Sequence, residues 1–365
     1  MSRARNVANL GADTTNLEDI SSAYSAGALS NRNKIINGAM TIDERNAGAA
    51  VTLGATASFP VDRWKSHEDT DGSATAQQVS DAPAGFSNSI KVTVTSTDAS
   101  LTGLQYFDVR QQIEGYNIAD LSFGTAAAKA VTISFWVKSS VTGTYGGGIS
   151  NGAFNRSYPF TYSISAADTW EYKTITISGD TSGTWTTTNG TGMYLFFNLG
   201  SGPDYAGTAG QWNAAGDLAA TGTTNLIATS GATFYLTGVQ LEAGDTATPF
   251  EHRSYGDELA LCQRYYQTTD AVTFTGTLAT VVVGTLQFRT QMRAAPTVGL
   301  TASFKITDTF ASDYTQSVAN VSITANCITS SGAQMGMGNF SGLTAGRPYL
   351  SIPNETGLMT LSAEL

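Results

Sequence analysis

Hydrophobic and polar residues alternate along several stretches of the chain between residues 89 and 241. Residues 89–95 (SIKVTVT) alternate as expected for a strand with one buried and one solvated face. Residues 131–138 (VTISFWVK) place apolar side chains on one face and Trp136 with Lys138 on the other. Residues 192–199 are apolar on both faces, which indicates a central strand. Further strands are predicted at residues 104–113, 170–178 and 234–241.

The connections between these strands are rich in glycine and threonine, and none shows helical periodicity. Consecutive strands with no helix between them favour an antiparallel sandwich. The long connections favour a jelly roll over a simple meander. Trp64, in the sequence PVDRW, is expected to anchor the core where a strand enters the sandwich.

The period of the pattern changes after residue 253. Pro249 keeps the chain extended, and from Asp257 apolar residues recur at helical spacing, which predicts a short helix opening with Asp257 and Glu258. Residues 1–33 are small and polar and cannot bury a core of their own. We therefore expect an N-terminal arm (1–33), a β jelly-roll domain (34–253), and a short helix followed by a smaller C-terminal β domain (254–365). The last domain has expected strands at residues 272–288, 304–306, 318–325, 349–352 and 357–361.

The composition is typical of a β-rich extracellular or virion protein. Only 13% of the 365 residues are charged, against roughly 25% in soluble domains, and 38 are glycine. The formal net charge of -10 argues against nucleic-acid binding, which needs Lys and Arg to displace counterions, but leaves a glycan ligand open. The start is polar, with Arg3 and Arg5, and no apolar run approaches the roughly 20 residues of a membrane span. We expect synthesis in a cytoplasm and no membrane insertion.

The sequence offers little for catalysis. His67 and His252 are the only histidines and lie beside no nucleophile motif, and no zinc spacing or phosphate loop is present. A glycosidase needs two carboxylates facing each other across a cleft. Five acidic residues lie close together in sequence, but surface solvation and helix capping explain them: Glu242, Asp245, Glu251, Asp257 and Glu258. We expect no catalytic residue.

Four aromatic residues are the candidates for recognition, because rings on glycine-rich loops can stack on sugar faces. Tyr145 lies in a run of glycines, Trp185 in Gly183-Thr184-Trp185, and Tyr205 and Trp212 in a long segment rich in Gly and Ala. The alternative is that these rings pack over the edge of the sandwich or against a neighbouring subunit.

Several motifs resemble those of tailed-phage tail fibres and other phage virion structural proteins. Residues 238–251 (GVQLEAGDTATPFE) with 253–267 (RSYGDELALCQRYYQ) are similar to a junction found in that group. The opening MSRARNVANLG, the later NKIINGAM and PVDRW, and the terminal LSAEL resemble other parts of these proteins.

The resemblance implies a non-enzymatic virion protein, a tail fibre or appendage subunit that attaches to the host. It implies a homotrimer, docking to other tail proteins through residues 1–33, and a host-surface glycan as possible ligand. A capsid decoration or head-fibre protein and a glycan-degrading tailspike are the alternatives.

The strand FYLTGVQLEAG is similar to the last strand of carbohydrate-binding jelly rolls, in which an Asp-Asp-Val or Asp-Asn-Val triplet often supplies a structural calcium ligand. The matching positions are Thr237, Gly238 and Val239, so the carboxylate is missing. Calcium prefers several hard oxygen ligands that include carboxylates. We therefore expect neither a metal nor another cofactor.

Overall fold

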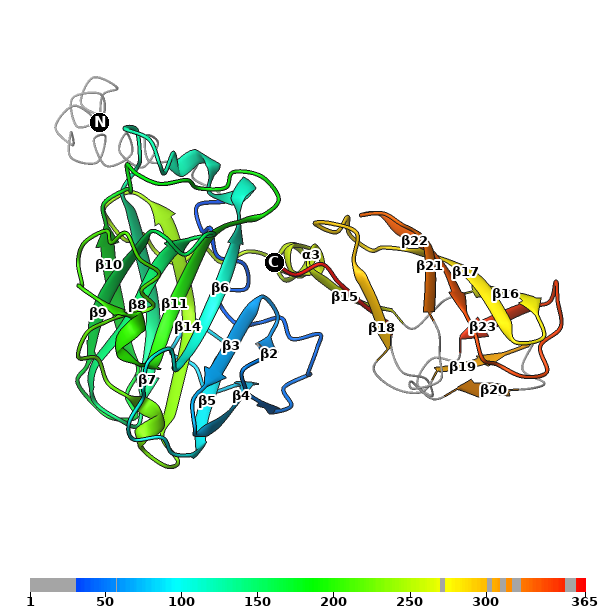
Figure 1. Ribbon diagram of the computed structural model, residues 1–365, viewed down its shortest axis with the longest axis horizontal. Helices are drawn as coiled ribbons and strands as arrows, with labels where there is room; N and C mark the ends of the chain where they lie inside the picture. Colours follow the sequence, from blue (N-terminus) through cyan, green and yellow to red (C-terminus); the bar gives the residue numbers. More distant parts are fainter. Residues whose placement is uncertain are drawn as a thin grey trace, which may run out of the picture. The chain divides into compact units, whose positions relative to one another are not determined.

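The computed structural model describes residues 31–56, 58–269, 273–300, 304–308, 313–316, 323–351 and 359–365. The chain forms two compact units, and the boundary between them lies between Arg253 and Ser254 (Figure 1). Strands hold 45% of the described residues and helical turns 7%, which confirms the prediction of an all-β protein built from antiparallel sheets. Residues 1–30, most of the predicted N-terminal arm, lie outside the described residues.

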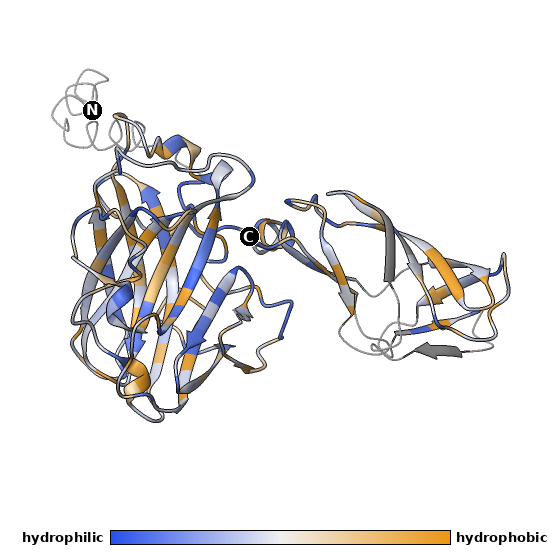
Figure 2. Cartoon of the chain, in the orientation of Figure 1, coloured by the Kyte–Doolittle hydropathy of each residue, from blue (hydrophilic) through white to orange (hydrophobic). Residues whose placement is uncertain are grey.

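The first unit is a sandwich of two six-stranded antiparallel sheets. In sheet A the strand order is β1 (Val51–Thr52), β4 (Ser73–Val79), β5 (Ser89–Ser96), β14 (Thr233–Ala243), β7 (Val131–Ser139), β10 (Glu171–Ile177). In sheet B it is β2 (Ser58–Val61), β3 (Trp64–Asp69), β6 (Tyr106–Glu114), β11 (Thr191–Ser201), β8 (Gly143–Asn151), β9 (Ser157–Ile164). Hydrophobic and hydrophilic positions alternate along these strands (Figure 2), so each sheet turns one apolar face inward.

The core of the sandwich lies between the two sheets. Trp64 is fully buried at the start of β3 and its indole N–H donates to the carbonyl of Asn37 at 2.9 Å, which confirms its prediction as a core anchor. Strand β11 pairs with β6 on one side and β8 on the other, so its prediction as a central strand is also confirmed. Its inward residue Phe197 packs against Trp64 with ring centroids 6.2 Å apart.

The glycine run around Tyr145 forms strand β8, which corrects the expectation of a loop. A methyl group on Gly147 would lie 2.5 Å from the ring of Phe160, and one on Gly146 would lie 3.2 Å from Ala219. Ala219 belongs to β13 (Ala219–Ala220), which pairs with β12 (Ala206–Gly207) and contacts β8 and β9. Glycine is therefore used here because other groups approach both faces of the strand closely.

Strand β14 contains a bulge at the position matching the calcium triplet. Gly238 has φ +61°, and the pairing of β14 with β7 shifts register between Thr237 and Gln240. Before the bulge, residues 233–236 of β14 also pair with β5. After it, the same side of β14 is taken by the start of the described chain, residues 33–38.

Short 3₁₀ helices make the tight connections of the first unit. They are η1 (Gly115–Asn117), η2 (Ala119–Leu121), η3 (Pro203–Tyr205) and η4 (Leu226–Ala228).

The second unit begins with the predicted short helix, α3 (Tyr255–Gln263). Its N-cap Ser254 accepts a hydrogen bond from the backbone N–H of Asp257 at 3.2 Å. One sheet has the order β15 (Tyr266–Thr269), β24 (Met359–Ser362), β18 (Thr297–Leu300). The other has the order β20 (Asp313–Gln316), β19 (Phe304–Thr307), β23 (Pro348–Ser351), β16 (Thr273–Leu278), β17 (Val281–Gln287), β22 (Gly332–Met337), β21 (Ile323–Ile328). The strand expected at residues 318–325 falls partly outside the described residues.

Candidate functional site

Tyr145, the first candidate for recognition, lies in the core of the first unit. Its side chain is fully buried, and its hydroxyl bonds to the hydroxyl of Ser139 at 2.9 Å and donates to the carbonyl of Val141 at 2.8 Å. Its ring stacks on Tyr162 with centroids 6.0 Å apart. The structure therefore places it where it presents no ring face to a ligand.

Trp185 and Trp212 lie together, with ring centroids 5.6 Å apart. Phe123 packs edge-on against both, at 4.9 and 5.8 Å. Each indole N–H already donates to a backbone carbonyl, Trp185 to Ser182 at 3.2 Å and Trp212 to Ser178 at 2.8 Å. This cluster ties loops to the sandwich, as in the packing alternative.

Tyr205 lies elsewhere, at the outer face of sheet B. It ends η3, and its ring meets that of Tyr106 in β6 at 5.3 Å, nearly perpendicular. Phe107, Val109 and Ile113 of β6 point into the core, so Tyr106, Asp108, Arg110 and Gln112 lie on the outer face of the sheet, and of these four only Tyr106 is partly exposed.

We call the group of outward residues around Tyr106 the ring face. It consists of Lys65 and His67 of β3, Tyr106, Asp108, Arg110 and Gln112 of β6, Tyr194 and Phe196 of β11, and the neighbouring Phe154 and Tyr205. Strand register brings them together, because Lys65 is opposite Arg110, which is opposite Phe196. Side chains opposite each other on one face of antiparallel strands are close neighbours.

Arg110 is at the centre of the ring face. Its guanidinium carbon lies 5.2 Å from the ring centroid of Tyr106 and 5.1 Å from that of Phe196, within cation–π range of both. The guanidinium also binds both carboxylate oxygens of the fully buried Asp108, at 2.9 and 2.7 Å. Burial raises the pKa of Asp108, and the charge of Arg110 counteracts that rise. The ion pair with Asp108 holds the guanidinium in place beside both rings.

Polar groups hold the remaining rings. The hydroxyl of Tyr106 bonds to Nδ1 of His67, and the amide of Gln112 donates to the hydroxyl of Tyr194 at 3.0 Å. Burial raises the pKa of Tyr106, so its hydroxyl keeps its proton at neutral pH. Phe154 packs on Tyr194 at 4.4 Å and is 36% exposed. Four rings of the face are therefore partly exposed in fixed orientations, those of Tyr106, Tyr194, Tyr205 and Phe154, whereas Phe196 and Arg110 are buried beneath the surface.

Such an arrangement can stack on the apolar face of a sugar ring and hydrogen-bond its hydroxyls. It is not arranged for two-carboxylate hydrolysis, since Asp108 is the one carboxylate among the residues that define the ring face and it is bound to Arg110.

Two of the acidic residues expected at the surface lie elsewhere and have structural partners. Glu242 is buried, which corrects its expected exposure, and it accepts hydrogen bonds from the N–H and hydroxyl of Thr248 at 2.8 and 2.7 Å. Glu251 accepts a hydrogen bond from the N–H of Asn33 at 2.9 Å.

A second group of rings lies on the outer face of sheet A. Trp136 and Tyr172 are opposite each other and 5.3 Å apart, and Tyr172 is 45% exposed. Beside them Lys138 lies over the rings of Tyr235 and Trp170, and Asp81 binds both Lys138 and the indole N–H of Trp170. These contacts hold the loop that carries Asp81 against the sheet.

Within the part of the chain that the structure describes, no three His, Cys, Asp or Glu side chains are grouped so that they could hold a metal ion. Over the same residues, every helix is too short or too polar to cross a membrane.

No protein-family model matches the chain, and no curated protein matches its sequence. Similar solved structures include the enzymatically active domain of tailspike protein 4 of bacteriophage CBA120, with 11% identity and a TM-score of 0.32. That match covers 58% of this chain and 22% of the tailspike chain, so it spans about a fifth of the latter.

Carbohydrate-binding modules are also among the similar structures. One is the family 11 module of a cellulosomal cellulase of Clostridium thermocellum, with 14% identity, coverage of 56% of this chain and 100% of that one, and a TM-score of 0.28. Another is TmCBM61 in complex with β-1,4-galactotriose, with 10% identity, coverage of 50% and 88%, and a TM-score of 0.26.

Proposed function

We propose that the protein is a non-enzymatic structural protein of a phage particle, a tail fibre or tail appendage subunit, and that the ring face of its first unit binds host-surface glycan. The observation that carries the binding proposal is the arrangement around Arg110, which orients Tyr106 and Phe196 beside the partly exposed rings of Tyr194 and Phe154. Rings held in place before binding lose little conformational entropy when a sugar stacks on them.

The virion part of the proposal is supported by the sequence motifs. The segments NKIINGAM and GVQLEAGDTATPFE, which resemble parts of phage virion proteins, flank the sandwich at its two ends. In this reading residues 1–33 dock to other tail proteins, and the protein works as a homotrimer.

Attachment through such a face would be multivalent. A single sugar contact on one partly exposed face is weak, with a Kd on the order of millimolar. Linked copies bind with an effective concentration that raises avidity by roughly 10²–10⁴. A negatively charged protein also avoids nonspecific adhesion to polyanions.

The test is glycan binding by the full chain with three matched ring variants. A panel of host-surface oligosaccharides is screened on an array, and affinity for the best ligand is then measured by isothermal titration calorimetry. We expect Tyr194→Ala and Phe154→Ala each to weaken binding by several-fold to about tenfold, the loss expected when one aromatic contact worth ~0.5–1.5 kcal/mol is removed.

The control is Tyr172→Ala, which removes an exposed ring from the opposite sheet and should leave the affinity unchanged. Equal weakening by Tyr172→Ala, or no binding by the wild type to any host glycan, contradicts the assignment of the ring face. Release of reducing sugar from the same oligosaccharides would contradict the non-enzymatic part and favour a tailspike.

A further inference from the structure

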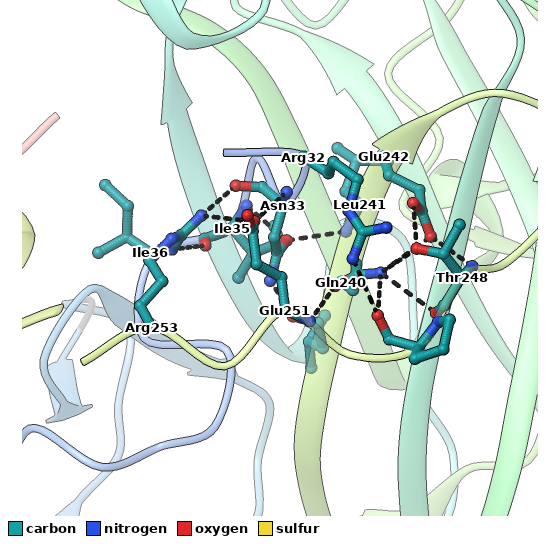
Figure 3. A network of polar contacts seen from close by, with 12 residues as sticks. Arg32, Asn33, Ile35, Ile36, Gln240, Leu241, Glu242, Thr248, Glu251 and Arg253 are labelled. Carbon is teal, nitrogen blue, oxygen red and sulfur yellow. Dashed lines mark hydrogen bonds and ion pairs between the residues drawn. The ribbon is translucent and has the colours of Figure 1, made fainter. Parts of the chain in front are cut away.

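The two ends of the first unit meet beside residues 239–242 of strand β14 (Figure 3). There Arg253 donates to the carbonyl of Ile35 at 3.0 Å and to the carbonyl of Asn33. The N–H of Asn33 donates to Glu251 at 2.9 Å, and Arg32 donates to the carbonyl of Pro249 at 3.3 Å. These contacts join residues 217 to 220 positions apart in the sequence.

Both ends are also fixed to strand β14. The side chain of Asn33 accepts from the N–H of Leu241 at 3.1 Å and donates to the carbonyl of Val239 at 3.1 Å, so it pairs with β14 as a strand backbone would. On the other end, buried Gln240 accepts from the N–H of Glu251 at 2.8 Å and donates to the hydroxyl of Thr248 at 3.2 Å.

We call these groups the end clamp. It consists of Arg32, Asn33, Gln240, Glu242, Thr248, Glu251 and Arg253. Its amides, carboxylates and guanidinium groups are largely buried and bonded to each other or to backbone, and charge-assisted hydrogen bonds in such surroundings are the strong ones.

We infer that the end clamp is a mechanical coupling, through which tension passes between the N-terminal arm and the second unit without entering the sandwich. When the chain is pulled at residues 32 and 254, the force first loads the hydrogen bonds of Asn33 with Arg253 and Glu251. The strands between them bear no tension until those contacts break. An appendage pulled by its two ends would then keep the ring face folded.

The inference is tested by force-clamp spectroscopy of the full chain held by its two termini. Unfolding of residues 33–253 is recognised by an extension of roughly 70–80 nm, the length of a chain of that size. Arg253→Met keeps the aliphatic stem but removes the guanidinium. Loss of charge-assisted bonds should shorten the lifetime of the first unit at fixed force by about tenfold or more.

Arg156→Met is the matched control, because it removes a two-bond ion pair with buried Asp180, at 2.8 and 2.6 Å, elsewhere in the same unit. It should leave the end-to-end lifetime unchanged even where it lowers thermal stability. A second geometry places the handles at exposed residues 127 and 167, and there Arg253→Met should have no effect.

Three results would overturn the inference. These are an unchanged end-to-end lifetime in Arg253→Met, an equal shortening by Arg156→Met, and an equal shortening by Arg253→Met in both pulling geometries. The last two would mean that the clamp acts only through the overall stability of the unit. None of these three results depends on glycan binding, so the proposed function is tested independently of the end clamp.

Discussion

Asp62 is a residue whose ionisation is strongly altered by the fold. It lies in the turn between β2 and β3, where it accepts a hydrogen bond from the N–H of Glu44 at 3.0 Å and lies 3.3 Å from the guanidinium of Arg45. Burial outweighs these contacts and raises its pKa from 3.8 to about 7. The folded protein therefore holds a proton on Asp62 at pH values where the unfolded chain does not.

This shift makes stability depend on pH with a definite sign. The contribution of Asp62 is fully present below about pH 4, where both states are protonated, and is lost as the pH rises to about 7. Asp62→Asn cannot ionise, so between pH 4 and 7.5 it should gain up to ~4 kcal/mol relative to the wild type.

Urea unfolding followed by tryptophan fluorescence measures the gain, because all five tryptophans lie in the first unit. The prediction is contradicted if the free energy of unfolding changes with pH equally in Asp62→Asn and in the wild type. That result would show that Asp62 is ionised in the folded protein at neutral pH.

At the scale of elements, the sequence pattern predicted six of the twelve strands of the sandwich, and one place where it failed is a strand in which glycine replaces the alternation. Strand β8 reads GTYGGGISN, in which only Tyr145 and Ile149 mark the inward face. Nothing local shows that Phe160 fills the space above Gly147 or that β13 covers Gly146. A run of glycines predicts a loop unless the approaching partners are known.

The same strand supplies a test of this close approach. A methyl group at Gly147 would lie 2.5 Å from both the Phe160 ring and the carbonyl oxygen of Phe196, whereas at Gly148 the nearest atom is 3.3 Å away. We expect Gly147→Ala to destabilise the first unit by ~1–3 kcal/mol and Gly148→Ala by clearly less. Tryptophan-monitored urea unfolding gives both values. Equal effects would mean that strand propensity, not packing, decides the use of glycine here.

The candidate site was predictable only in part, for a similar reason. Of the four rings selected from glycine-rich segments, Tyr205 alone lies at the ring face. Its partners Tyr106 and Arg110 lie in the strand predicted at residues 104–113, but their meeting with Phe196 depends on the pairing of β6 with β11. Cross-strand register between distant segments is not encoded in any local pattern.

At the scale of the whole molecule, the fibre proposal predicts a position on the virion. Virions are imaged by cryo-electron microscopy after labelling with an antibody fragment against residues 254–365. Label on radiating tail appendages is the expected result, because the resemblance is to tail-fibre proteins. Label spread over the shell would favour capsid decoration, and absence of label from particles would contradict a virion location.

The end clamp gives the motifs NKIINGAM and GVQLEAGDTATPFE a common structural explanation. Asn33 comes from the first, and Gln240, Glu242, Thr248 and Glu251 come from the second. Because these side chains bond to each other where the two ends of the first unit meet, the residue types in one segment constrain those in the other. None of these bonds involves a residue of the ring face.

The pairing of Asn33 with β14 also sets the order of events during synthesis. Asn33 leaves the ribosome 206 residues before its partner Val239. At about 5–20 residues per second, it waits roughly 10–40 s for that partner. Ile36 can meet the side chain of Gln111 earlier, but sheet A is completed only when β14, which lies between β5 and β7, emerges. The nascent chain must therefore stay soluble with sheet A incomplete during this wait, and its net charge of -10 favours that solubility.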